Sequence, residues 1–134
     1  MADPLSIVSS ISALLQLTRA VVHFLSDISG TSESRQNILN EVSSLSDLLV
    51  ILIEVTKRSH QSHTWSTTRK SLSHLDGPLV QCQKEMERLK SKLKRTKFGE
   101  VLTWPFENDE INKILKAIER QKTSFVLSLQ TDHL

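Results

Sequence analysis

A long apolar segment, which carries no charged side chain between residues 4 and 18, constrains the fold of this chain more than any other feature. Residues along it recur at alternating spacings of four and three, which is one stripe of a helix. That stripe consists of Ile7, Ile11, Leu14, Thr18, Val21, Leu25 and Ile28. Val8 and Leu15 lie beside the stripe, whereas Leu5 and Leu17 lie off it. The predicted helix is therefore more apolar than a surface helix requires, and other helices or another apolar partner must cover it.

Three further segments show a helical stripe of apolar residues. The stripes contain Ile38, Val42, Leu45, Leu49 and Leu52 in the first, Leu75, Leu79, Cys82, Met86, Leu89 and Leu93 in the second, and Ile111, Leu115, Ile118, Phe125 and Leu129 in the third. Because residues 48–53 are apolar on every side, we expect them to be the most buried segment.

The four segments predict an all-α fold. We expect helices over 4–28, 32–58, 66–97 and 107–130. The third helix is predicted to kink at 76–78, because Pro78 clashes with the carbonyl four residues earlier. A period near 3.5 and short or tethered connections indicate a four-helix up-down bundle, which makes the chain 1–134 one domain.

Composition favours a soluble resting state in the cytoplasm. The single cysteine excludes an internal disulfide, and the N-terminus has no basic residue ahead of its apolar run, unlike a signal peptide. The uncharged run of 4–18 would reach about 22 Å as a helix, short of the ~30 Å hydrocarbon core of a bilayer. A longer span would include Arg19, which is costly to insert.

Basic residues gather in one part of the chain. Residues 57–97 contain eleven basic and three acidic residues, whereas the remainder contains six basic and twelve acidic ones. The densest cluster consists of Lys84, Arg88, Lys90, Lys92, Lys94, Arg95 and Lys97. Such a cluster suits contact with anionic lipid, and a solvated helix face is the alternative interpretation. Since no aromatic residues interleave with these cations, we expect no nucleic acid partner.

We expect no catalytic site, no cofactor and no metal. His60 and His63 are three residues apart, but no carboxylate or cysteine nearby completes a zinc set. Cys82 falls on an apolar stripe, where a cysteine is usually a small buried hydrophobe. The three glycines lie far apart, which argues against a phosphate-binding loop. The chain is therefore predicted not to be an enzyme.

Several of these features together resemble a known family. The opening MADPLSIVSSISALLQL looks like the start of the HeLo-like domains that precede fungal STAND-type, NLR-like receptors. Three more marks agree, namely the Leu79-x-x-Cys82-x-x-x-Met86-x-x-Leu89 run, the Trp104-Pro105-Phe106 structural corner and the helix with Glu110-Ile111, Leu115 and Ile118-Glu119-Arg120-x-Lys122. The resemblance covers residues 2–132, nearly the whole chain.

The resemblance implies a helical bundle that executes programmed cell death in filamentous fungi. The family is similar to the HeLo domain of a heterokaryon-incompatibility toxin, the killer domain of mixed lineage kinase domain-like protein, and coiled-coil domains of plant immune receptors. In these proteins a sensor module triggers self-association, and the N-terminal helix moves to the plasma membrane. The membrane-active positions carried over to this chain are Leu5, Ile7, Val8, Ile11, Leu14, Leu15 and Leu17.

Two questions stay open at this point. The alternative function is a non-enzymatic adaptor bundle, in which the first helix stays docked and the domain acts through homotypic or partner contacts. A downstream sensor module is expected if the chain is an excised domain, and a small stand-alone relative is the other possibility.

Overall fold

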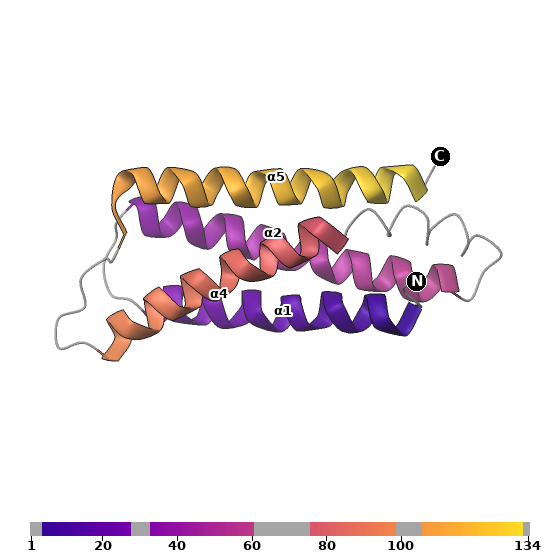
Figure 1. Ribbon diagram of the computed structural model, residues 1–134, viewed down its shortest axis with the longest axis horizontal. Coiled ribbons are helices and arrows are strands. Elements are labelled where there is room, and N and C mark those ends of the chain that lie inside the picture. The colour runs from indigo at the N-terminus through magenta and orange to yellow at the C-terminus, as the bar shows by residue number, and fades with distance from the viewer. Residues whose placement is uncertain (1–3, 28–32, 61–75, 99–105, 133–134) are drawn as a thin grey trace.

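The computed structural model describes residues 4–27, 33–60, 76–98 and 106–132, which form four α-helices (Figure 1). The helices are α1 (Pro4–Asp27), α2 (Glu33–His60), α4 (Asp76–Phe98) and α5 (Asn108–Asp132). The described residues contain no strand, and each helix packs against two others. The predicted all-α fold, a four-helix bundle, is therefore confirmed.

The predicted kink falls at the start of α4. This helix begins at Asp76, so Pro78 lies in its first turn, where backbone N–H groups have no partner within the helix. Proline therefore removes no helical hydrogen bond there. The preceding part of the predicted helix, 66–75, lies outside the described residues, as does the connection between α2 and α4.

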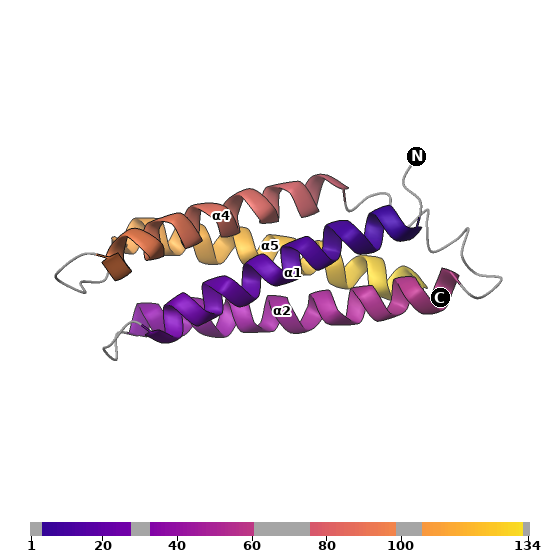
Figure 2. The same ribbon diagram turned by 90° about the horizontal axis from the view of Figure 1, so that it is seen from below.

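The helices alternate in direction along the chain, and their order around the bundle is α1, α2, α5, α4 (Figures 1 and 2). α1 lies beside α2 and α4, and α5 lies beside the same two helices. α2 and α4 therefore occupy diagonally opposite corners and run in opposite directions. The first turn of α1 and the last turn of α5 lie at the same end of the bundle.

Acidic side chains open three of the helices. Glu33 lies in the first turn of α2, Asp76 in that of α4, and Asp109 and Glu110 in that of α5. Negative charge is favourable there because the helix dipole leaves a partial positive charge at the N-terminus. These residues help each helix to begin where it does.

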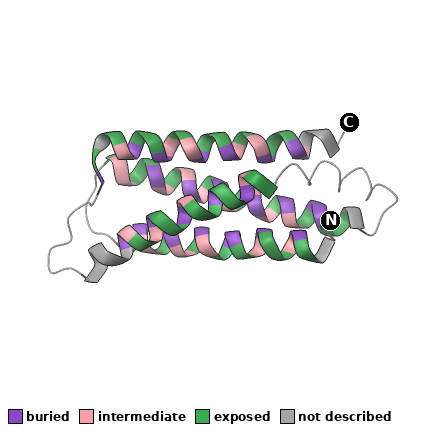
Figure 3. Cartoon of the chain, viewed as in Figure 1, coloured by how far each residue is buried: buried purple, intermediate pink, exposed green. Residues whose placement is uncertain are grey.

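One core runs along the axis, built from the predicted stripes (Figure 3). Its fully buried side chains include Ile11, Leu14, Leu25, Ile38, Leu45, Leu49, Leu52, Met86, Leu89 and Phe125. Burying each Leu or Ile contributes about 1.5–3 kcal/mol relative to exposing it, so this core is the main source of stability.

The expectation that 48–53 is the most buried segment was wrong, because Leu48, Val50 and Ile53 are only half-buried. Leu49 and Leu52 are fully buried, but Ile51 is 46% exposed. α2 sits at a corner of the bundle with neighbours on two sides, so its outward face meets solvent whatever residue stands there. An apolar run cannot reveal which of its members face outward.

Candidate functional site

The predicted membrane-active side chains of α1 mostly face the core. Ile7, Ile11, Leu14 and Leu15 are buried. Val8 and Leu17 are half-buried, and the side chain of Leu5 lies outside the described residues. In this arrangement the other helices cover most of the apolar stripe, so α1 is docked.

The outward face of α1 is only weakly polar. Through Gln16 its exposed residues are Ser6, Ser9, Ser10, Ala13 and Gln16, and the first exposed charge is Arg19. The Ser10 hydroxyl donates to the Ser6 carbonyl oxygen at 3.0 Å. Buried Thr18 likewise donates to the Leu15 carbonyl oxygen at 2.8 Å. Because such hydroxyls already have backbone partners, moving them into an apolar medium costs less than moving unpaired ones.

By length and composition α1 could cross a membrane. Its segment Ser6–Asp27 has 22 residues and contains an 18-residue stretch with a mean hydropathy of 1.4. A helix of that length spans about 33 Å, slightly more than a hydrocarbon core of ~30 Å. Buried core helices of soluble proteins and signal sequences near an N-terminus meet the same criterion.

The basic residues of the α4 cluster lie in different environments. Lys84 and Arg88 are exposed and Lys90 is half-buried. Arg88 lies 3.9 Å from the Glu85 carboxylate, a weak pair on a side chain that is 76% exposed. Further along α4 come Lys94, Arg95 and Lys97, whose side chains lie outside the described residues. Lys84 and Arg88 are thus the described cations of the cluster that face solvent most fully.

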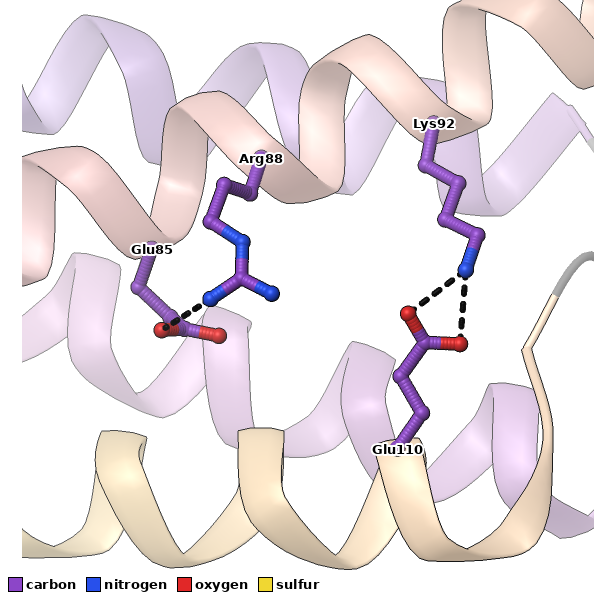
Figure 4. A network of polar contacts seen from close by, with 4 residues as sticks. All are labelled: Glu85, Arg88, Lys92 and Glu110. Atoms are coloured by element: carbon purple, nitrogen blue, oxygen red, sulfur yellow. Dashed lines mark hydrogen bonds and ion pairs between the residues drawn. The ribbon is translucent and has the colours of Figure 1, made fainter.

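Lys92, in contrast, is partly buried and paired between α4 and α5 (Figure 4). Its Nζ donates to both carboxylate oxygens of Glu110, at 2.6 and 2.5 Å, and so joins α4 to α5. The same Nζ lies 5.0 Å from the centroid of the Phe106 ring, within the range of a cation–π interaction. The hydrogen bond from Lys92 lowers the pKa of the Glu110 carboxyl. Lipid contact by Lys92 therefore requires this pair to break.

The predicted corner is described only at Phe106. This side chain is buried, and its ring lies beneath Lys92 at the start of α5. Trp104 and Pro105 lie outside the described residues. Phe106 thus packs at the entry to α5, and the three-residue corner stays a prediction.

A second ion pair attaches α5 to α2, and sequence analysis missed it. Lys122 Nζ donates to Glu41 Oε2 at 2.8 Å. These two residues are 81 positions apart, and no spacing rule links them. The Lys92–Glu110 pair was missed in the same way, although both of its residues lie near the ends of predicted neighbouring helices. An antiparallel register for those helices would have brought them together.

The described residues offer no evident site for chemistry. A cleft of about 280 Å³ between α4 and α5 is lined mainly by the charged pairs and by Leu89, Phe106 and Ile114. No three His, Cys, Asp or Glu side chains within the described ranges gather as metal ligands. Burial, with a smaller effect of Glu85, raises the pKa of the Cys82 thiol to about 12, which suppresses the nucleophilic thiolate.

Comparison of the chain with known protein families, curated proteins and solved structures finds no match.

Proposed function

We propose that this chain is a non-enzymatic cell-death effector domain that oligomerises and targets or permeabilises membranes through α1, under the control of an attached NLR-like sensor. The observation that carries the proposal is the lack of charge on the outward face of α1. The large apolar side chains described on this helix are buried or half-buried, and through Gln16 its exposed positions carry only serine, alanine and glutamine. A membrane-active role accounts for the absence of charge from this face.

Both the bundle core and the lipid hydrocarbon offer α1 an apolar environment. Burial of about seven apolar side chains of α1 in the bundle contributes on the order of 10 kcal/mol to docking, before the loss of conformational entropy is subtracted. Lipid hydrocarbon offers the same side chains a similar environment. A modest trigger is then sufficient to shift the equilibrium from the docked helix to the membrane-bound one.

The basic residues of α4 provide the attraction to an anionic surface. Each cation near an anionic membrane contributes about 1 kcal/mol, so Lys84, Arg88 and the cations that follow add up to a useful affinity. The proposed location is the cytoplasm at rest and the plasma membrane after activation.

Dye release from anionic liposomes tests the proposal. The wild-type chain is compared with a Ser9→Glu/Ala13→Glu/Gln16→Glu variant, alone and clustered through a C-terminal inducible dimerisation module. These three positions are exposed in the bundle, so the folded monomer tolerates the charges. A charge at the centre of a membrane helix costs about 2.5–3.5 kcal/mol, so leakage is expected to disappear.

The matched control is Asn37→Glu/Asn40→Glu/Ser44→Glu, which adds the same charge to the exposed face of α2. It is expected to leak as the wild type does. Circular dichroism verifies that all three chains are helical. Equal leakage from the two charged variants contradicts a role for α1. Absence of leakage from clustered wild type favours the adaptor alternative.

A further inference from the structure

The contact between α4 and α5 is the least extensive of the four contacts that close the bundle. α1 packs against α2 and α4, α2 also packs against α5, and each of these contacts is more extensive than the one between α4 and α5. α4 crosses the bundle obliquely and diverges from α5 toward its own C-terminal end (Figure 1). Because packing energy is a sum over many small contacts, it holds α4 and α5 together less firmly than the other neighbouring helices.

A cleft lies between these two helices. It has a volume of about 280 Å³, and its apolar wall is made by Leu89, Phe106 and Ile114. Lys92 and Glu110 also line the cleft, and their ion pair crosses it from one helix to the other (Figure 4). These five residues are called the α4–α5 seam below. The ion pair thus joins the helices at a place where side chains do not fill the space between them.

The contact between α2 and α5 contains a closely matched ion pair. The side chains of Lys122 and Glu41 are 23% and 36% exposed, and those of Lys92 and Glu110 are 30% and 34% exposed. The chemistry and the exposure of the two pairs are therefore alike, whereas the packing around them differs. Losing the ion pair is expected to open the contact more readily where the packing beside it is sparse.

We propose that the bundle opens at the α4–α5 seam, with the Lys92–Glu110 pair as the clasp that keeps it closed. The helices form a ring in the order α1, α2, α5, α4, so parting α4 from α5 unrolls the ring. The contacts of α1 with α2 and α4, and of α2 with α5, stay intact. Local opening of this kind requires less free energy than unfolding of the whole bundle, because it breaks fewer contacts.

Opening at the seam gives α1 a route to the membrane. The apolar stripe of α1 belongs to the core, so unrolling the ring uncovers it before α1 leaves its neighbours. Pulling α1 out directly would break the more extensive contacts with α2 and α4 first. Opening also releases Lys92 from Glu110, so that it joins exposed Lys84 at an anionic surface, which favours the open form there. This route rests on the proposed function, whereas the opening itself is measurable without lipid.

Covalent linkage across the seam tests the opening. The full chain carries Lys92→Cys and Glu110→Cys joined by a short bismaleimide, and the control carries Glu41→Cys and Lys122→Cys joined by the same reagent. Both pairs replace an ion-paired lysine and glutamate, so the linker meets similar geometry. Buried Cys82 remains as the free thiol, and its labelling rate in lipid-free buffer reports opening. Linkage across the seam is expected to slow labelling about tenfold relative to the control linkage. Equal rates overturn the inference.

Two single substitutions provide a second readout that needs no linker. Lys92→Met removes the clasp and is expected to speed the labelling of Cys82 about fivefold, as a loss of roughly 1 kcal/mol does. Lys122→Met removes the matched pair between α2 and α5, and labelling is expected to stay within about twofold of the wild type. Circular dichroism verifies that both chains are helical. A rate for Lys122→Met equal to or above that for Lys92→Met overturns the inference.

Liposome leakage from clustered chains separates this inference from the proposed function. The chain linked across the seam is expected to release no dye, and the control linked between α2 and α5 is expected to leak as the wild type does. Slower labelling of Cys82 by the seam linkage, with no leakage from any chain, supports the opening and rejects the membrane function. Leakage that persists in the seam-linked chain retains the membrane function and overturns the seam as its route.

Discussion

The ammonium group of Lys92 lies between the two carboxylate oxygens of Glu110, and it connects the C-terminal half of α4 to the first turn of α5. Both side chains are about one-third exposed, and the Phe106 ring lies beside the ammonium. The pair therefore links two helices at the point where the chain reverses. The ion pair, the contact with the Phe106 ring and the position of Glu110 in the first turn of α5 all hold α4 and α5 together.

Replacing Lys92 by methionine is expected to destabilise the bundle by about 1 kcal/mol. The substitution keeps the apolar stem but removes the ion pair and the cation–π contact, and partly exposed pairs of this kind contribute modestly. Urea unfolding followed by circular dichroism measures the change. The control is Lys113→Met on the exposed face of α5. Substitutions at such surface positions usually change stability by less than about 0.5 kcal/mol, and the same is expected here. Equal effects of the two substitutions would show that the pair contributes nothing.

Acid is expected to weaken the bundle through the same pair. Lys92 holds the pKa of Glu110 below its ordinary value of 4.5, because the hydrogen bond favours the carboxylate. A lowered pKa in the folded state contributes stability above the ordinary value, and that stability is lost as the pH falls through the folded value. Urea midpoints measured from neutral pH to below pH 4.5 are expected to fall less steeply in Glu110→Gln than in wild type. Parallel profiles for the two proteins would contradict this assignment.

Two neighbouring residues in the apolar run of α2, Ile51 and Leu52, are expected to differ sharply in how much their replacement by alanine destabilises the bundle. Leu52 is fully buried, so Leu52→Ala removes core contacts and costs about 2–5 kcal/mol. Ile51 faces outward, so Ile51→Ala is expected to cost less than about 0.5 kcal/mol. Chemical denaturation of the two variants at low protein concentration measures both values. A large loss in Ile51→Ala would mean that this side chain packs within its own bundle.

The same run shows what could be predicted from the sequence. Helical periodicity located the core stripes, because a residue must recur every three or four positions to face one side. It could not show that Ile51 is exposed, since that depends on where neighbouring helices lie. The Lys92–Glu110 and Lys122–Glu41 pairs depend on the order and register of the helices, which periodicity does not specify. The same limit applies to the placement of α2 and α4 on opposite corners of the bundle.

Cys82 is expected to resist thiol reagents in the folded protein. Its side chain is fully buried, and burial raises the pKa of the thiol to about 12, so little thiolate exists at neutral or mildly alkaline pH. Labelling is expected to proceed only through opening of the bundle, with a rate that rises with urea. A chromogenic disulfide reagent measures that rate, and Val80→Cys in a Cys82→Ala background provides an exposed thiol for comparison. Labelling of Cys82 as fast as that control would contradict the packing of α4.

Gln121 provides the last prediction, because it places an amide in the core of α5. The side chain is 6% exposed, and its Oε1 has no hydrogen-bond partner among the described residues. A buried acceptor without a partner costs about 1–3 kcal/mol, so Gln121→Leu is expected to stabilise the bundle by about 1–2 kcal/mol in urea unfolding.

Under the proposed function, a more stable bundle holds α1 more tightly, and clustered Gln121→Leu is expected to release less dye from liposomes than the wild type does. Gln121→Glu buries a charge and is expected to destabilise the bundle. Destabilisation by leucine would indicate that the amide is satisfied, and unchanged leakage from a stabilised variant would separate membrane action from opening of the bundle.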